Sequence, residues 1–434
     1  MEVVYSRCCG LDIHKKLLVA CRIVPGSDGR PCKEIRTFGT MTEDLLQLGD
    51  WLAAEQVTHV AMEATGIYWH PNYNLLEACF ELLLVNAQHI KAVPGRKTDV
   101  KDCEWIADLL RHGLLRPSFV PPRPQRECRE RTRYRTTLVR ERGAEVNRLQ
   151  KTLEGANIKL AGVASNILGT SSRKMLEQLI AGTTDGVALA ELARGRLRAK
   201  LPQLQQALTG QVGPHQRFLL ARQLAHIDAL EQLITEVSTE IGQRLHAATG
   251  FQPPAPQAPP RATAADAPVP LAAIAQRLQT IPGVGQRAAE IVIAEVGVDM
   301  RRFPSAAHLA SWAGLCPGNH ESAGKRRSGK PRHGSPWLRT LLVEAAQAAS
   351  RTKQTALAAR FQRLIGRLGY KKALLALAHT ILRIIYALLK HGTTYQERGP
   401  LVDDQAREAA IRRGIRKLQA LGVTVTVTPA PPAA

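Results

Sequence analysis

Paired cysteines are missing from this chain of 434 residues. Its eight cysteines are scattered at positions 8, 9, 21, 32, 79, 103, 128 and 316, and no two form a Cys-x-x-Cys pair. A zinc ribbon needs such pairs, and a disulfide scaffold is typical of short secreted chains with many cysteines. We therefore expect reduced thiols and assign these cysteines no chemistry.

Long apolar runs are also missing, and we expect no secretory leader. A membrane-spanning helix needs about 20 consecutive apolar residues, whereas the apolar stretch at 373–378 is short and soon interrupted. Residues 1–5 show no basic region followed by an apolar core, which argues against secretion. We expect a cytoplasmic protein without a membrane partner.

Acidic residues are too few to balance the basic ones. The chain has 37 Asp and Glu against 59 Lys and Arg, a formal net charge of +22 and a pI near 10.1. Such a charge favours a polyanionic partner, nucleic acid first, through counterion release. With 44% hydrophobic and 22% charged residues the composition is that of a globular protein, and the length predicts two or more folded units.

Residues 1–125 read as an alternating α/β domain. Three apolar runs predict adjacent strands, and helix-strand repeats follow them. This order is typical of the RNase H-like (RuvC-like) arrangement. The expected strands are 8–13, 17–24, 35–40, 57–63 and 81–86, and the expected helices are 42–54 and 72–79.

The rest of the chain is expected to be helical. In 126–250, two series of apolar residues follow heptad spacing, and they indicate either two helices packed on each other or a coiled-coil arm that dimerises. The Pro/Ala-rich stretch 251–270 predicts a linker. Residues 271–398 form a mainly α unit, and 399–434 form a tail expected to be partly disordered.

Four acidic residues of the first domain are candidates for a shared site. Asp12 lies inside the first strand, where a carboxylate needs a partner, and Glu63 ends the fourth. Parallel pairing of these strands would place the two side by side. Asp99 and Asp102 are spaced i, i+3 on a predicted helix and would share one face, whereas Asp108 lies off that face and is expected to be solvated.

Clustered carboxylates repel one another unless a hard cation such as Mg²⁺ or Mn²⁺ neutralises them. Two such ions can stabilise the attacking and leaving oxygens of phosphodiester cleavage. Each acid taken alone is more often a helix cap or a surface residue. The order of strand, strand end and helix pair favours the metal site.

Two segments of the last domain indicate contact with nucleic acid. The turn 280–285, with Gly283 and Gly285, opens a helix over 288–296 and resembles a helix-hairpin-helix element that holds a phosphate on backbone amides. Residues 325–334 form a basic, glycine-rich loop before a helix near Trp337, read either as a solvated loop or as a phosphate clamp. The predicted nucleic-acid contacts are Lys97, Lys101, Gly283, Gly285, Lys325, Arg326, Arg327, Lys330, Arg332 and Arg339.

Ser322 lies just before this basic loop. A hydroxyl nucleophile needs activation by a base or a metal, and nothing near it in the sequence supplies one beyond His320, Glu321 and the basic charges. On chemical grounds alone, a serine in such a loop is expected to be inert.

Several motifs, in order along nearly the whole chain, resemble those of the transposases of the insertion-sequence family one-hundred-ten, which includes the RNA-guided bridge recombinases. The segment 155–215, the Pro/Ala linker and the tail after 400 depart from shorter members. The matching motifs are GLDIHK at 10–15, MEATG at 62–66, KTDVKD at 97–102, ADLL at 107–110, IPGVG at 281–285, WAGLCP at 312–317, ESAG at 321–324 and G-x-x-x-LR at 334–339.

The resemblance implies a DEDD metal centre formed by Asp12, Glu63, Asp99 and Asp102. It also implies that Ser322 attacks DNA and forms a phosphoserine linkage. It further implies that the two sites meet across a dimer, that dimers pair into a tetramer, and that a structured noncoding RNA specifies the element ends and the target. Such a protein is expected near the nucleoid of a prokaryote.

Three functions follow from these observations. The first, which we predict, is a DNA transposase or recombinase with a metal site and a serine nucleophile. The second is a RuvC-like Holliday-junction resolvase or metal-dependent nuclease that uses water, which leaves the C-terminal motifs without a task. The third is a catalytically silent nucleic-acid-binding scaffold.

Overall fold

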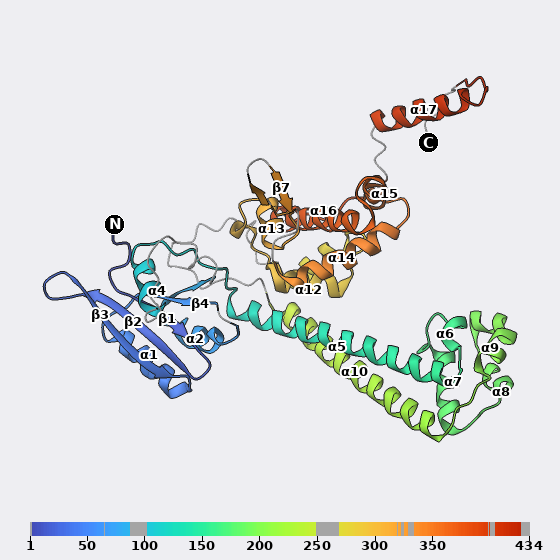
Figure 1. The fold of residues 1–434 in the computed structure, drawn as a ribbon, viewed down its shortest axis with the longest axis horizontal. Helices are drawn as coiled ribbons and strands as arrows, with labels where there is room; N and C mark the ends of the chain where they lie inside the picture. Colours follow the sequence, from blue (N-terminus) through green and yellow to red (C-terminus); the bar gives the residue numbers. More distant parts are fainter. Residues whose placement is uncertain are drawn as a thin grey trace. The chain divides into compact units, whose positions relative to one another are not determined.

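A computed structural model of the chain describes residues 2–64, 66–86, 102–248, 269–318, 320–322, 325–328, 334–397, 399 and 404–426 (Figure 1). For 320–322, 325–328 and 404–410 it describes the backbone only. The chain divides into two compact units, Met1–Pro121 and Pro122–Ala434. The linker predicted at 251–270 lies outside the described residues, apart from its last two.

Unit 1 is built on a mixed five-stranded sheet, with strand order β3-β2-β1-β4-β5. The first three strands are antiparallel neighbours, whereas β1, β4 and β5 run parallel. β3 begins before the predicted residue 35, because it pairs with β2 along its whole length, down to Pro25 opposite Pro31. The strands are β1 (Cys8–Ile13), β2 (Leu17–Pro25), β3 (Pro31–Gly39), β4 (His59–Glu63) and β5 (Glu81–Val85).

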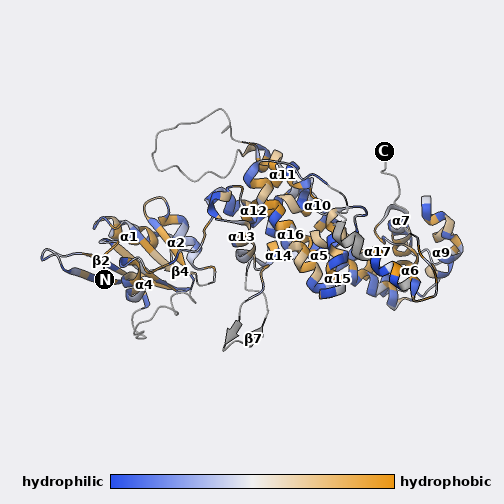
Figure 2. Cartoon of the chain, turned by 90° about the horizontal axis from the view of Figure 1, so that it is seen from above, coloured by the Kyte–Doolittle hydropathy of each residue, from blue (hydrophilic) through white to orange (hydrophobic). Residues whose placement is uncertain are grey.

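Helices cover both faces of this sheet. α1 (Thr42–Ala53) and α2 (Trp69–Leu76) bury their apolar residues against one face, and α4 (Asp102–Arg111) buries its own against the other. Figure 2 shows these helices with an apolar and a polar side, the pattern of helices that pack on a sheet. The second helix was expected at 72–79 and lies three residues earlier.

Unit 2 begins with a pair of long antiparallel helices, α5 (Arg123–Gly155) and α10 (Pro214–Ala247), which lie side by side in Figure 1. Leu138 packs against Leu230 and Ile234, and Arg142 forms an ion pair with Glu231. The structure shows the first of the two interpretations of the heptad pattern, in which two helices of the same chain pack on each other. The first of the two series of apolar residues, which starts at Val139, continues at heptad spacing to Leu160 in the sequence. The helix α5 that contains it ends at Gly155.

Five short helices connect the two long ones and form a separate small core with them. This core contains Leu149 and Leu153 of α5, Leu176 and Leu179 of the short helices, and Leu220 of α10. Residues 155–215, the long segment noted in the sequence, are thus a folded helical cap on the α5/α10 pair. The short helices are α6 (Leu160–Val163), α7 (Thr170–Ala181), α8 (Gly186–Ala190), η1 (Gly195–Lys200) and α9 (Leu201–Leu208).

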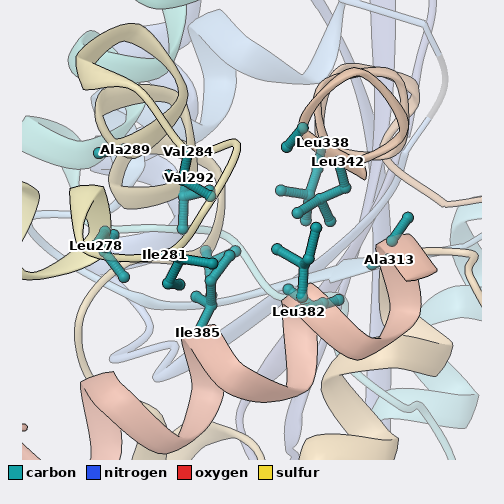
Figure 3. Packing of buried hydrophobic residues seen from close by; sticks show 14 of the residues in the cluster. Leu278, Ile281, Val284, Ala289, Val292, Ala313, Leu338, Leu342, Leu382 and Ile385 are labelled. Atoms are coloured by element: carbon teal, nitrogen blue, oxygen red, sulfur yellow. The ribbon is translucent and has the colours of Figure 1, made fainter. Parts of the chain in front are cut away.

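The remaining helices of unit 2 share the largest core of the chain, part of which Figure 3 shows around Ile281, Leu338 and Leu382. A short hairpin, β6 (His320–Ser322) and β7 (Lys325–Ser328), interrupts them. The basic loop was predicted to have no strand, so the hairpin corrects that expectation. The helices are α11 (Leu271–Gln279), α12 (Gln286–Val296), η2 (Met300–Arg302), α13 (Ala306–Trp312), α14 (Pro336–Arg351), α15 (Ala356–Leu368) and α16 (Tyr370–His391), and α17 (Asp404–Gln419) lies in the tail.

The apolar stretch at 373–378 belongs to α16, a longer helix than its sequence suggests. Among the described helices, α16 is the one whose length and composition would allow it to cross a membrane. Its residues Leu377, Ile381 and Ile385 are fully buried in the core of unit 2. Burial in the protein core explains why this helix is apolar, and no membrane is needed to explain it.

Candidate metal-binding edge and serine hairpin

Asp12 and Glu63 lie at neighbouring positions of the sheet. β1 and β4 are parallel, and their register pairs Gly10 with Ala61 and Leu11 with Met62. One further step along this register brings Asp12 beside Glu63, the last residue of β4. The two acids are therefore side by side at the carboxyl ends of adjacent strands, the placement that the strand order predicts.

Both acidic residues belong to the face of the sheet that α4 covers. Side chains alternate between the two faces along a strand. Leu11 and Met62 belong to the core beneath α1 and α2, whereas Ala61 belongs to the core beneath α4. Asp12 and Glu63, one residue after Leu11 and Met62, therefore lie on the α4 side.

The close approach of α4 to β1 depends on Gly10. A Cβ at this position would lie 2.3 Å from the carbonyl oxygen of Cys103 and 2.4 Å from the amide nitrogen of Ala107. Burial, together with the negative charge of Asp12, raises the pKa of the Cys103 thiol. The start of α4, with Asp102 as its first residue, thus lies within electrostatic reach of Asp12.

The fourth acid of the predicted set, Asp99, lies outside the described residues, as do Lys97 and Lys101. That Asp99 and Asp102 share one helix face stays a prediction. Within the described part of the chain, no group of three His, Cys, Asp or Glu side chains lies close enough to hold a metal ion. The donor type still fits, since carboxylate oxygens are the ligands that Mg²⁺ and Mn²⁺ prefer.

His14 also belongs to this edge, although the sequence analysis did not select it. Its Nε2 lies 3.1 Å from Oδ2 of Asp12, and the side chains are 59% and 27% exposed. The backbone amide of His14 donates to the carbonyl of Leu17 and closes the β1-β2 turn. The spacing of two residues, which puts both side chains on one side of an extended strand, was the available signal.

Asp108 corrects one expectation. It was predicted to be solvated, but its Oδ2 accepts a 2.6 Å hydrogen bond from Nζ of Lys33, which also contacts Glu104 at 3.0 Å. Burial alone would lower the pKa of Lys33, but its hydrogen bonds to the two carboxylates outweigh this and raise it. The ion pairs join β3 to α4 across the sheet, a long-range contact that helix periodicity does not encode.

The predicted nucleophile, Ser322, is the last residue of β6. In the hairpin its backbone pairs with that of Lys325, and Glu321 pairs with Arg326. Of the other predicted contacts, Arg327 lies on β7, whereas Lys330 and Arg332 lie outside the described residues. Arg339 lies in the first turns of α14.

Gly334 and Ser335, just before α14, are closely packed. A Cβ at Gly334 would come within 2.5 Å of the backbone of Ala313 and Gly314. The hydroxyl of Ser335 accepts a hydrogen bond from the amide of Leu338 and caps α14. Gly334 and Ser335 therefore define where α14 begins.

The predicted helix-hairpin-helix element consists of α11, the turn 280–285 and α12. Gly283 has a φ of +87°, and a Cβ there would lie 2.3 Å from the carbonyl oxygen of Ala345 in α14. Gly283 is thus needed for the turn and for packing. Gly285 precedes α12 and is exposed, so the predicted phosphate contact fits Gly285 better than Gly283.

Two buried carboxylates of α12 were missed by the sequence analysis. Glu290 is 2% exposed and accepts a 2.6 Å hydrogen bond from Arg135, itself 2% exposed. Glu295 is 1% exposed and accepts both hydrogen bonds of the Arg133 guanidinium, at 2.7 and 2.9 Å. These ion pairs join α5 to α12. Because the partners lie far apart in the sequence, no local pattern predicts the pairs.

Two family models match this chain in order. One, described as a transposase model and carrying the DEDD domain, matches residues 9–158. The other, described as transposase IS116/IS110/IS902 family, matches residues 275–362. The first match contains Asp12, Glu63, Asp99 and Asp102, and the second contains Ser322.

Curated relatives agree with both models. A probable family 20 transposase of Pseudomonas aeruginosa is 28% identical over 342 residues, which is 78% of this chain and 85% of that protein. The transposase for insertion sequence element IS1111A of Coxiella burnetii is 38% identical over 28% of this chain and 34% of its own length. A pilin gene-inverting protein of Moraxella bovis is 30% identical over 29% of this chain and 39% of its own.

The two family models match in the expected order, and the Pseudomonas aeruginosa transposase aligns over most of both chains. All three indicate the same family. The chain belongs to the IS110 family of insertion-sequence transposases, enzymes that cleave and rejoin DNA, with a DEDD domain in its N-terminal part.

Proposed function

We propose that unit 1 is an RNase H-like (RuvC-like) domain whose edge holds Mg²⁺ or Mn²⁺ through Asp12, Glu63, Asp99 and Asp102. The side-by-side placement of Asp12 and Glu63, on the face where α4 begins with Asp102, carries this proposal. A divalent cation there would stabilise charge on the phosphodiester during cleavage. The carboxylates would orient the scissile phosphate but would not supply the nucleophile.

In the same proposal, Ser322 supplies the nucleophile. Its Oγ loses a proton to a base and forms a bond with phosphorus, while the phosphorus bond to one DNA oxygen breaks and that oxygen takes up a proton. The phosphodiester energy is retained in a serine-phosphate link, so that another strand can later displace the serine. Hydrolysis by water would lose that energy.

The proposed partners are the DNA of the element ends and target, together with a structured noncoding guide RNA. The DEDD edge and the serine hairpin belong to different units of the chain, which suits a composite site shared by two copies. We infer a dimer that pairs into a tetramer, with the α5/α10 pair as one contact, in the cytoplasm of a prokaryotic cell.

Covalent trapping tests this proposal. The full-length protein is incubated with nicked element-end DNA, Mg²⁺ and any cognate RNA, then denatured and digested for mass spectrometry. The expected product is a DNA adduct on the peptide that contains Ser322, absent in Ser322→Ala. The matched control is Ser328→Ala on the partner strand of the hairpin, which should retain the adduct.

Two outcomes would contradict the proposal. An adduct that survives Ser322→Ala would remove the serine from its role. Cleavage without any adduct would favour the alternative, a RuvC-like junction resolvase or nuclease that activates water with the same acids.

A further inference from the structure

A narrow groove in unit 2 has no role in the function proposed above. Most of its lining residues belong to α5 and α14, which form its two walls, and Ile291 of α12 also lines it. Arg133, Thr136 and Arg140 line the first wall, and Trp337 and Glu344 line the second. Its volume is about 40 Å³, so the space between the walls suits a single small group, such as a phosphate, better than a base.

Two arginines of α5 lie over the ring of Trp337. The guanidinium carbon is 5.0 Å from the ring centroid for Arg140 and 5.8 Å for Arg133. Contacts of this kind attract a cation to the ring face and favour arginine, whose planar group can stack there. Trp337 therefore orients both guanidinium groups toward the groove between the helices.

The two arginines differ in how their charge is balanced. Glu295 binds Arg133 through both carboxylate oxygens, so Arg133 belongs to the buried network. Arg140 is exposed and forms no ion pair with any side chain that the structure describes, Glu344 of the same groove included. Arg140 is thus an oriented positive charge without a carboxylate partner.

The groove lies directly after the hairpin along the chain. Trp337 follows Gly334, which packs against Ala313, and Ser335, whose hydroxyl donates a 3.1 Å hydrogen bond to Oε2 of Glu295. Glu295 thus holds Arg133 of one wall and the residue that begins the other. In the sequence, α14, which forms one wall, is the helix that follows the hairpin carrying Ser322.

We propose that this groove binds a backbone phosphate of the DNA strand that the serine hairpin engages, with Arg140 as the phosphate ligand and Trp337 as its positioning residue. The inference rests on the proposed function, which gives the hairpin its strand. A protein with a net charge of +22 meets that strand through its phosphates, and a stacked arginine is preorganised for a phosphate. Glu344, which also lines the groove, would weaken phosphate binding, and the positive charge of Arg140 has to outweigh it.

Salt dependence of binding tests the proposal without requiring cleavage. The probe is a fluorescein-labelled 30-base-pair DNA duplex with the element-end sequence, titrated with full-length protein in EDTA between about 50 and 300 mM KCl. Arg140→Gln should weaken binding several-fold and lower the slope of log K against log salt by about 0.9, the loss of one phosphate contact. Trp337→Leu should weaken binding less than Arg140→Gln does and leave the slope unchanged, because the charge stays near the phosphate but loses its orientation.

Two further variants separate the groove from general charge and from misfolding. Arg142→Gln, which removes an arginine paired with Glu231 on another side of α5, should leave the slope unchanged. Arg140→Lys should restore the slope and only part of the affinity. All variants are first checked for an unchanged thermal unfolding midpoint.

An unchanged slope in Arg140→Gln, or an equal fall in Arg142→Gln, overturns the proposal. A fall seen only with an RNA duplex of the same sequence overturns the assignment to DNA. Failure of covalent trapping on Ser322 would leave this slope unaffected, so the two proposals fail separately.

Discussion

Acidic side chains have different surroundings in the two units. In unit 1, Asp12 and Glu63 lie half-buried at the edge of the sheet, where solvent and an ion have access. In unit 2, Glu290 and Glu295 are almost completely buried and are bound by arginines of α5. In the function proposed here, residues of the same chemical type bind a ligand in unit 1, whereas in unit 2 they stabilise the fold.

The difference has consequences for charge and stability. A buried carboxylate needs a partner of opposite charge, because desolvation of a lone charge is very unfavourable. Asp12 and Glu63 are partly exposed to solvent at the sheet edge, and in our proposal a cation accounts for their proximity. Removing an edge acid should therefore affect chemistry, whereas removing a buried acid should affect stability.

The largest expected effect is that of an edge carboxylate of unit 1 on DNA cleavage. Asp12→Asn keeps the shape of the side chain but removes its charge, and it should reduce DNA cleavage by roughly a thousandfold, the several kcal/mol that a catalytic cation supplies. The free energy of unfolding should change by less than about 1 kcal/mol, because the contact with His14 is exposed. Gel assays of strand cleavage and urea denaturation measure the two quantities, with the exposed acid variant Glu43→Gln as control.

The second effect is on the stability of unit 2. Glu290→Ala leaves Arg135 charged and buried, and it should lower the free energy of unfolding by about 3–5 kcal/mol. The double variant Arg135→Met/Glu290→Leu removes both charges and should recover most of the loss. Urea denaturation followed by circular dichroism measures this, with Glu344→Ala on the exposed side of α14 expected to change it by less than about 0.5 kcal/mol. Equal losses in Glu290→Ala and Glu344→Ala would remove the distinction.

A third prediction joins packing to the metal edge. Gly10→Ala places a methyl group 2.3 Å from the Cys103 carbonyl, which pushes the start of α4 and Asp102 away from β1. We expect a stability loss of about 1–3 kcal/mol, the usual range for overpacking, and a clear loss of cleavage. Gly143→Ala, a helix glycine with open space around it, is the matched control and should stabilise α5 slightly. A fully active Gly10→Ala would show that α4 does not need this contact.

The smallest effect near neutral pH concerns the buried thiols. Burial raises the pKa of Cys8 to about 12 and that of Cys128 to about 11, from an ordinary value of 9.0. In the native protein a maleimide at pH 8 should therefore label the exposed Cys32 and Cys79 first. Rapid labelling of Cys8 would contradict the packing of unit 1.

The same shifts predict how stability depends on pH. The unfolded chain ionises its thiols above pH 9, whereas the folded chain keeps them protonated, so folding is fully favoured below pH 9. Stability should fall as the pH rises from 9 toward 11 or 12, by roughly 1 kcal/mol per pH unit for each such thiol.

Local sequence patterns predicted much of the fold. The strands β1, β2, β4 and β5 follow from apolar runs, and the side-by-side placement of Asp12 and Glu63 follows from strand order. The pairing of α5 with α10 was one of two interpretations that heptad spacing left open. Spacing cannot distinguish a partner helix in the same chain from one in a second copy.

The features that the sequence did not predict are set by long-range contacts. Lys33 meets Asp108 across 75 positions, and Arg135 meets Glu290 across 155. No local pattern reports such pairs, so Asp108 was wrongly expected to be solvated. The β6-β7 hairpin was missed because its strands are short and rich in charge, which opposes strand propensity. Ser322 was selected only through family resemblance.

Metal binding tests the central claim most directly. Mn²⁺ is titrated into the full-length protein, and the electron paramagnetic resonance signal of the free ion reports how much is bound. We predict binding by the wild-type protein, by Glu43→Gln and by the Arg135→Met/Glu290→Leu variant, with a severe loss in Asp12→Asn and in Glu63→Gln. Undiminished Mn²⁺ binding by both Asp12→Asn and Glu63→Gln would contradict the account.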